Sequence, residues 1–473
     1  MDLNSLTIKQ ALEKLSNEEI SAVELTSACL EQIKKYNGEI NAFITVDEKG
    51  ALESAEKADN ERKNGGTSPL LGIPIALKDI FLTKGLKTTA ASKVLENYIP
   101  QYDATVTKKL KDAGAVILGK TNLDAWAHGS SGENSDFGKT LNPWNKEYVP
   151  GGSSSGSAAS LAASMCLAST GTDTGGSIRL PASFNNVVGL KPTYGRVSRY
   201  GIIAMASSLD SIGHFTKTVE DSALLLSVTA GSDPLDATTP QNSVPDYLDM
   251  GSGVKGLRIG VPKEYFTGGL DKEIKGKTED AIKKLEELGA EIVEISLPNT
   301  EYAIAVYYII MSSEVSSNLA RYDGIRYGNS RESFGEEAKR RIMLGTFTLS
   351  AGYYDAYYKK AMQVRTLIKQ DFEKAFEKVD AIISPVSPTA PWKLGEKVDD
   401  PLKMYLSDIF TVTANLAGIP GLSVPAGFTS EGLPVGIQIL GPQFSEEKLF
   451  QIGNAYEKAT RFYEIKSPIA NSV

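Results

Sequence analysis

The chain has 473 residues and a formal net charge of −8, with 41% hydrophobic and 23% charged residues. This composition is typical of a globular protein with a large core, and the acidic excess argues against a protein that holds nucleic acid through its overall charge. No apolar run reaches 18 residues and no secretion signal opens the sequence, so we expect a cytoplasmic protein without a membrane span. Two cysteines, Cys29 and Cys166, and two histidines, His128 and His214, exclude a disulfide framework and make a metal site on this chain unexpected.

The first elements in chain order are helices, expected over residues 1–65 and packed on the core as an N-terminal region. Capping boxes at residues 7–10 (TIKQ) and 21–24 (SAVE) predict two helix starts. The pair Asn37-Gly38 predicts a helix end.

From about residue 70 to 240, short apolar runs alternate with helical stretches and with loops rich in glycine, serine and asparagine. The runs are residues 73–77, 115–118 and 165–168. Strands that are apolar throughout and separated by helices indicate a sheet that is covered on both faces.

The last part of the chain has the same alternation on either side of a helical segment. This segment includes the tyrosine-rich stretch 352–360, for which we expect a packed helix face or a contact between subunits. We therefore predict an α/β fold over residues 66–473, a mixed β-sheet sandwiched between helices with one helical insertion. The elements expected here are strands at 257–262, 291–297, 381–384 and 435–440, an apolar run at 421–424, helices at 271–288, 402–416 and 445–460, and the insertion at about 299–376.

Two motif matches do not fit their usual context. Residues 114–121 (GAVILGKT) match a phosphate-binding loop, but the residues between the glycines form an apolar strand where that loop needs a flexible backbone. Residues 152–156 (GSSSG) match a nucleophile elbow, but His214 is the one histidine downstream and no functional loop surrounds it. For His128 and His214 alike, we weigh a structural role above a catalytic one.

Three other stretches carry reactive side chains. Lys78 ends an apolar strand, Ser153 lies in a glycine/serine loop that opens onto a helix, and Ser177 follows two glycines in GTDTGGSIR (171–179). A serine nucleophile needs a base, and burial that lowers the pKa of a lysine by about 3 units makes that lysine a usable base. Consecutive N–H groups from Thr174 to Ser177 (Thr174, Gly175, Gly176 and Ser177) are candidates for an oxyanion hole.

These stretches as a group resemble the amidase signature family. GGSSSG (151–156) and DTGGSIRLP (173–181) match its signature, and Lys78 falls where the family keeps its lysine. The resemblance implies Ser177 as the acyl-ester nucleophile, Ser153, preceded by a cis peptide, as the proton relay, and Lys78 as the base.

Most of the chain is also similar to the A subunits of the amidotransferases that act on Glu-tRNA(Gln) and Asp-tRNA(Asn). The stretches that carry this resemblance include VVGLKPTYGRVSRYGIIAMASSLDSIG (187–213) and KRRIMLGTFTLSAGYYDAYYKKAMQVRTLIK (339–369). It implies that the chain hydrolyses glutamine without a cofactor of its own. The ammonia would pass to a B subunit that binds ATP, Mg²⁺ and the misacylated tRNA. A small C subunit would brace the complex, and no membrane would be involved.

The same resemblance implies residues for the α-groups of glutamine, namely Arg341 for the carboxylate and Asp408 for the ammonium. His128 stands in DAWAHG (124–129), where related subunits usually carry methionine, and we expect it to shape the substrate pocket. A stand-alone amidase that hydrolyses small amides, and a non-catalytic protein of an assembly, are the alternative functions.

Overall fold

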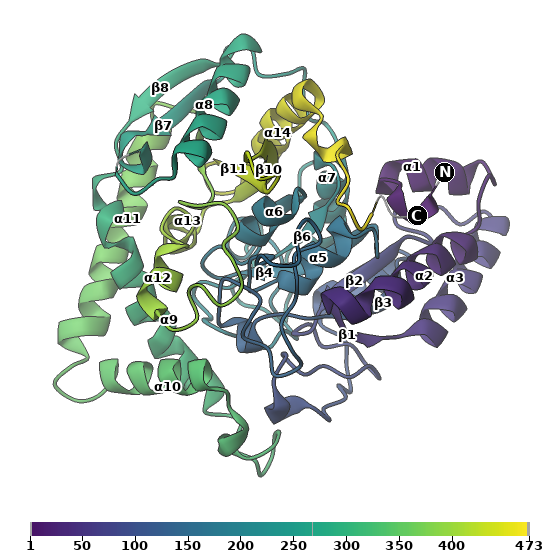
Figure 1. Ribbon diagram of the computed structural model, residues 1–473, viewed down its shortest axis with the longest axis horizontal. Helices are drawn as coiled ribbons and strands as arrows, with labels where there is room; N and C mark the ends of the chain where they lie inside the picture. The colour runs from purple at the N-terminus through teal and green to yellow at the C-terminus, as the bar shows by residue number, and fades with distance from the viewer. Residues whose placement is uncertain (1, 267, 471–473) are drawn as a thin grey trace.

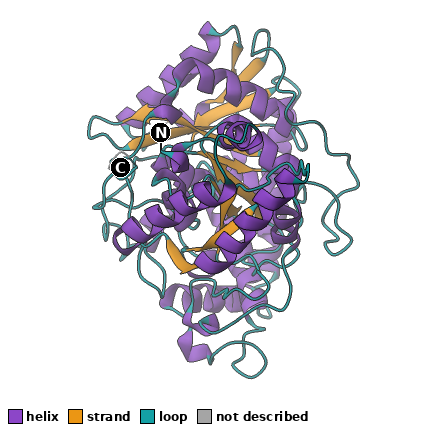
Figure 2. Cartoon of the chain, turned by 90° about the vertical axis from the view of Figure 1, so that its right-hand side faces the viewer, coloured by secondary structure: helices purple, strands orange, loops and turns teal. Residues whose placement is uncertain are grey.

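The computed structural model describes residues 2–266 and 268–470. Within them, one sheet of eleven strands runs through the molecule in the order β1-β3-β2-β4-β6-β5-β10-β11-β9-β7-β8. Helices lie on both sides of this sheet (Figures 1 and 2). The strands are β1 (Phe43–Val46), β2 (Pro74–Lys78), β3 (Val116–Thr121), β4 (Ala168–Asp173), β5 (Val188–Lys191), β6 (Ser211–Thr216), β7 (Arg258–Pro262), β8 (Glu291–Ile295), β9 (Ala381–Pro385), β10 (Gly421–Phe428) and β11 (Pro434–Leu440).

The sheet is mixed, as the sequence predicts. Strand β2 is parallel to both of its neighbours, β3 and β4, and β7 is parallel to β8 and β9, whereas the strands between these two groups pair antiparallel. Every residue of β2, β3 and β4 is buried, which is expected of strands that helices cover on both faces.

Helices α5 and α6 pack on one face of the central strands, and α7 and α14 pack together on the other. Helices α9, α10 and α11, between β8 and β9, form the predicted helical insertion, drawn in green in Figure 1. The helices are α1 (Ile8–Ser16), α2 (Ala22–Ile40), α3 (Glu48–Lys63), α4 (Thr105–Asp112), α5 (Ser155–Ala162), α6 (Arg179–Asn185), α7 (Val219–Thr229), α8 (Lys272–Glu287), α9 (Ala303–Leu319), α10 (Glu336–Thr348), α11 (Lys360–Phe376), α12 (Pro401–Leu406), α13 (Val412–Ala417) and α14 (Glu446–Thr460).

The N-terminal region differs from the sequence prediction in two places. Both capping boxes are present, at the starts of α1 and α2. However, α2 continues past Asn37 because this side chain exchanges two hydrogen bonds with the backbone of Phe43, and the helix ends one turn later where Asn41 adopts a left-handed conformation. Residues 43–46 form β1, which pairs with β3 at the sheet edge, so residues 1–65 are not helical throughout.

Two further expectations need correction. The apolar run 165–168 mostly precedes its strand, since β4 begins at Ala168. The helix expected at 402–416 is two short helices, α12 and α13, separated by the turn that carries Asp408. Of the tyrosines in 352–360, Tyr358 packs against the hydrophobic core, whereas Tyr353, Tyr354 and Tyr357 are 40–45% exposed. A contact between subunits stays the prediction for these three.

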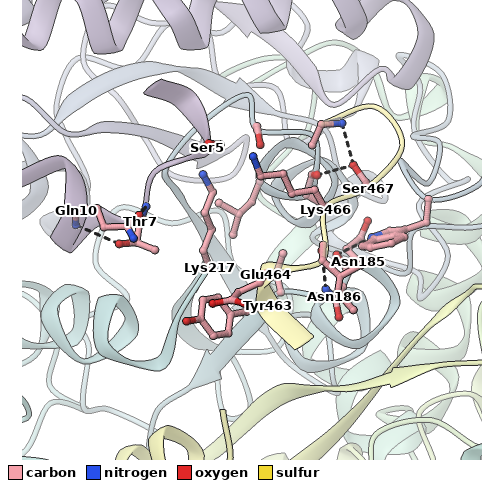
Figure 3. A pocket seen from close by; sticks show the side chains of 17 residues that line it. Ser5, Thr7, Gln10, Asn185, Asn186, Lys217, Tyr463, Glu464, Lys466 and Ser467 are labelled. Carbon is pink, nitrogen blue, oxygen red and sulfur yellow. Dashed lines mark hydrogen bonds between the residues drawn. The ribbon is translucent and has the colours of Figure 1, made fainter. Parts of the chain in front are cut away.

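The two ends of the described chain lie side by side (Figure 1) and border a cavity of about 230 Å³ (Figure 3). Lys217, which follows β6, donates hydrogen bonds to the carbonyl oxygens of Asn4 and Leu6 and so ties the N-terminal segment to the core. Burial lowers the pKa of Lys217 to about 8. Among the described residues, no helix is long and apolar enough to cross a membrane.

Candidate active site

The phosphate-loop and nucleophile-elbow matches have structural roles. Residues 116–118, between Gly114 and Gly119, belong to β3, and the Lys120 ammonium donates hydrogen bonds to Phe81 O and Thr88 Oγ1 inside the protein. His214 lies in β6 with its Nε2 2.8 Å from Ser222 Oγ, and burial lowers its pKa to about 3. Neither motif forms the site that its pattern suggests.

Lys78 and Ser177 lie at the same edge of the sheet. Lys78 is the last residue of β2, and Ser177 follows β4, its parallel neighbour. Because the carboxyl ends of parallel strands share one edge, residues 99 positions apart are brought to one place. Ser153 reaches this edge from the loop before α5, where Ser154 N–H donates to Ser177 O at 3.3 Å.

The Lys78 ammonium is enclosed by hydroxyl groups. Its Nζ is 2.9 Å from Ser153 Oγ, 2.9 Å from Ser154 Oγ and 2.8 Å from Thr172 Oγ1. The lysine is fully buried, and this burial lowers its pKa to about 7, against the opposing charges of three nearby aspartates. A lysine in this state exchanges protons near neutral pH, as a general base must.

The peptide bond between Gly152 and Ser153 is cis. Gly152 N–H donates to Ser130 O at 2.9 Å, which joins the serine loop to the segment after the residue 125–127 turn. The Ser153 hydroxyl is thereby held beside Lys78 by backbone contacts on its N-terminal side.

The backbone at 174–177 is shaped by a buried ion pair. Asp173 accepts hydrogen bonds from the Arg179 side chain at 3.0 Å and from Gly176 N–H at 2.9 Å. Although burial acts against it, the Arg179 charge and hydrogen bonds hold the pKa of Asp173 at about 2. Because its N–H is directed to Asp173, Gly176 is not an oxyanion donor in this geometry, which leaves Thr174, Gly175 and Ser177 of the four expected groups.

Arg341 and Asp408 approach each other across Tyr308 of α9. The Arg341 guanidinium lies 5.7 Å from the centre of the Tyr308 ring, and the Tyr308 hydroxyl is 3.5 Å from Asp408 Oδ2. Arg341 also pairs with Glu337 at 2.8 Å, and Asp408 accepts a bond from Ser130 Oγ at 2.8 Å. Burial raises the pKa of Asp408 to about 7, while the Ser130 bond and the Arg341 charge oppose this rise.

Several polar residues of the site were not expected from the sequence. Ser154 directly follows Ser153, and Thr172 directly precedes Asp173 of the signature motif. Their position next to motif residues is the sequence signal that could have identified them. Ser130 and Tyr308 have no local signal, because their role comes from contacts with residues far away in the chain.

Comparisons with known proteins agree with this geometry. The family model described as Amidase matches residues 24–450. The A subunit of the glutamyl-tRNA(Gln) amidotransferase of Desulfatibacillum aliphaticivorans is 56% identical over 98% of this chain and 99% of its own length. The corresponding protein of Geobacter metallireducens is 54% identical over 99% of this chain and 100% of its own length.

Solved structures show the same relationship. The crystal structure of the glutamyl-tRNA(Gln) amidotransferase A subunit from Thermotoga maritima has a TM-score of 0.83 and 47% identity, over 97% of this chain and 95% of that one. The 6-aminohexanoate cyclic dimer hydrolase complexed with substrate has a TM-score of 0.90 at 26% identity, with full coverage of both chains. The fold and the buried lysine–serine site thus define an amidase-type enzyme. The chain belongs to the amidase family and, within it, to the glutamyl-tRNA(Gln) amidotransferase A subunits.

Proposed function

We propose that this chain hydrolyses glutamine and supplies the ammonia with which a tRNA-dependent amidotransferase converts Glu-tRNA(Gln) to Gln-tRNA(Gln). The observation that carries this proposal is the fully buried Lys78, 2.9 Å from Ser153 Oγ and with a pKa of about 7, in a chain that is 53–56% identical to A subunits over nearly its whole length. The same chemistry would serve Asp-tRNA(Asn) if the partner subunits accept that tRNA.

The reaction begins when Ser177 Oγ attacks the side-chain amide carbon of glutamine. The Ser177 proton passes to Ser153 as the Ser153 proton passes to neutral Lys78, and N–H groups of Thr174, Gly175 and Ser177 stabilise the negative oxygen. The C–N bond then breaks, and the proton returns through Ser153 to the departing nitrogen, which leaves as ammonia. Water hydrolyses the glutamyl ester and releases glutamate and free Ser177.

Recognition of glutamine requires one cation and one anion for its two α-groups. We assign the α-carboxylate to Arg341 and the α-ammonium to Asp408. Their common contact with Tyr308 supports this assignment, because Arg341 lies over the Tyr308 ring while Asp408 lies at its hydroxyl group.

The remaining steps of transamidation belong to other subunits of the proposed complex. We expect a B subunit to bind ATP, Mg²⁺ and the misacylated tRNA, and a small C subunit to brace the assembly. The net charge of −8 fits a chain that leaves most contact with tRNA to its partner. Because the reaction serves translation, we expect the complex to act in the cytoplasm.

The test uses Ser177→Ala in the full chain, purified together with the subunits that accompany it. We expect ammonia release from glutamine to be lost, and a fluorophosphonate probe that labels the wild-type chain at Ser177 to leave the variant unlabelled. Assembly with the partners should be unchanged, since the Ser177 side chain is buried and the substitution removes one hydroxyl group. Retained glutaminase activity in this variant would refute the proposed nucleophile. A wild-type chain that purifies alone and hydrolyses small amides without preference would instead indicate a stand-alone amidase.

A further inference from the structure

A cavity of about 280 Å³ lies between the segment 128–134 and the first turns of α10 and α12. We call it the His128 cavity. Its wall combines a neutral ring, a paired guanidinium and several polar side chains. They include His128, Ser131, Asn134, Glu337, Arg341 and Tyr405.

Two groups of this wall are buried without a hydrogen-bond partner among the described residues, Glu133 Oε2 and the imidazole of His128. The His128 side chain is fully buried, and neither ring nitrogen has a hydrogen-bond partner among the described residues. The backbone holds the residue firmly, because His128 N–H donates to Ala125 O and His128 O accepts from Asn134 Nδ2 at 2.7 Å. Buried polar atoms in proteins are almost always paired, so a fixed ring with two unpaired nitrogens at a cavity wall points to a ligand.

The charge state of the ring follows from its surroundings. Burial and the positive charge of Arg341 lower the pKa of His128 well below its ordinary value, so the ring is neutral. A neutral imidazole offers one N–H donor and one acceptor nitrogen. The cavity wall carries carboxylates (Glu133, Glu336, Glu337) as well as cations (Arg340, Arg341, Lys397), so its net charge favours neither sign. The charge that acts on His128 is that of Arg341, and this neighbour makes an anion the suitable partner of the N–H.

The segment that carries His128 also contacts the reactive groups. Ser130 O accepts from Gly152 N–H beside the relay serine, and Ser130 Oγ donates to Asp408. One short segment therefore connects the His128 cavity, the proposed ammonium-binding carboxylate and the serine loop. In the proposed function, a glutamine whose amide reaches Ser177 has its α-groups at Arg341 and Asp408, and Arg341 also lines the His128 cavity.

We propose that His128 is a specificity-determining residue whose ring N–H donates a hydrogen bond to the α-carboxylate of the substrate, beside Arg341. This inference rests on the proposed function and deepens it, because it makes the site select for an α-amino acid amide over a simple amide.

The test compares three substrates with the full chain in its complex. Glutamine has both α-groups, 4-aminobutanamide lacks only the α-carboxylate, and 4-carbamoylbutanoate lacks only the α-ammonium. In His128→Met, a change of similar volume, we expect kcat/KM for glutamine and for 4-carbamoylbutanoate to fall roughly 10- to 100-fold, the range for one hydrogen bond to a charged group. The loss should appear mainly in KM, and kcat/KM for 4-aminobutanamide should be unchanged.

His128→Gln, which keeps an N–H donor, should restore part of the lost kcat/KM, and Asp408→Asn is the matched control with the opposite pattern. Asp408→Asn should impair glutamine and 4-aminobutanamide but not 4-carbamoylbutanoate. Equal losses on all three substrates in His128→Met, or no loss on any, would overturn the inference. So would a loss confined to the substrates that carry the ammonium. Fluorophosphonate labelling of Ser177 shows that each variant keeps a folded site.

These outcomes also separate the inference from the proposed function. If the wild-type complex releases ammonia from glutamine but His128→Met behaves like the wild type, the inference fails and the proposed function stands. If the wild-type complex does not hydrolyse glutamine, both fail.

Discussion

Replacing Lys78 with methionine should abolish catalysis and at the same time change how stability depends on pH. The methionine has a similar volume and removes a base with a pKa of about 7 from a fully buried position. General-base catalysis contributes about 10²- to 10⁴-fold, so kcat/KM for glutamine should fall by at least about 100-fold.

The stability effect follows from the two pKa values of this lysine. The ordinary value of 10.5 holds in the unfolded chain, and the value of about 7 holds in the folded protein. Between these limits the unfolded state binds more protons, so the free energy of unfolding of the wild-type protein rises with pH. At 1.36 kcal/mol per pKa unit, the contribution of Lys78 changes by about 2 kcal/mol between pH 7 and pH 9.

The Lys78→Met protein lacks this titration. Relative to the wild type, it should therefore gain about 2 kcal/mol of unfolding free energy when the pH is lowered from 9 to 7. The methionine also loses three hydrogen bonds to hydroxyl groups, each worth about 1 kcal/mol. That loss does not depend on pH, so it shifts both measurements equally and cancels from the comparison.

The assay is urea unfolding of both proteins at pH 7 and pH 9. Lys217→Met is the matched control, because Lys217 is a second buried lysine with a pKa lowered to about 8, and it bonds only to backbone oxygens near the N-terminus. This control should gain about 1 kcal/mol over the same pH interval and keep its glutaminase activity. If Lys78→Met and the wild type respond identically to pH, Lys78 is not the neutral base that the mechanism requires.

Three further perturbations test other parts of the site. Protonated Asp408 cannot pair with an ammonium, so KM for glutamine should rise about tenfold per pH unit as the pH falls below about 7. If KM keeps this pH dependence in an Asp408→Asn protein, Asp408 is not the group whose titration causes it. Arg179→Met leaves the Asp173 carboxylate buried without its partner and should cost about 3–5 kcal/mol in urea unfolding, and a cost below about 1 kcal/mol would contradict the importance of the pair. Gly176→Ala should abolish ammonia release, because Gly176 has a φ of +135° and an added Cβ would lie too close to Thr411 Oγ1. Ammonia release at the wild-type rate in this variant would show that the 174–177 loop tolerates displacement.

Much of the local structure could be predicted because its cause is local. The capping boxes at residues 7–10 and 21–24 form as expected, since a serine or threonine and an acid or amide three residues apart satisfy each other within one turn. The apolar runs at 73–77 and 115–118 lie largely in buried strands, β2 and β3, for the same kind of reason. Three short motifs predicted Lys78, Ser153 and Ser177 as the reactive group, because residue types that carry this chemistry are rare in combination, and the structure places Lys78 beside Ser153.

Some expectations failed where a distant contact overrode a local preference. Asn37 does not end its helix, because its amide bonds to Phe43 beyond the helix end. The segment 43–46 (FITV), by contrast, consists of aromatic and β-branched residues that favour a strand, so the helical prediction for residues 1–65 missed a local signal that the pairing of β1 with β3 bears out. Gly176 N–H is not an oxyanion donor, because the carboxylate of Asp173 receives it.

The sequence by itself determined the composition of the core, the helical insertion and the three residue types of the reactive group. The tertiary structure alone decided the strand order, which places Lys78 and Ser177 at one sheet edge, and the contacts of Ser130, Tyr308 and His128. The physical reason is that burying an apolar strand stabilises the folded protein by nearly the same free energy in many strand orders. The hydrophobic effect therefore does not specify which strands are neighbours. Hydrogen bonds and ion pairs between distant residues have no signature in the local sequence, and they exist only once packing has selected one arrangement.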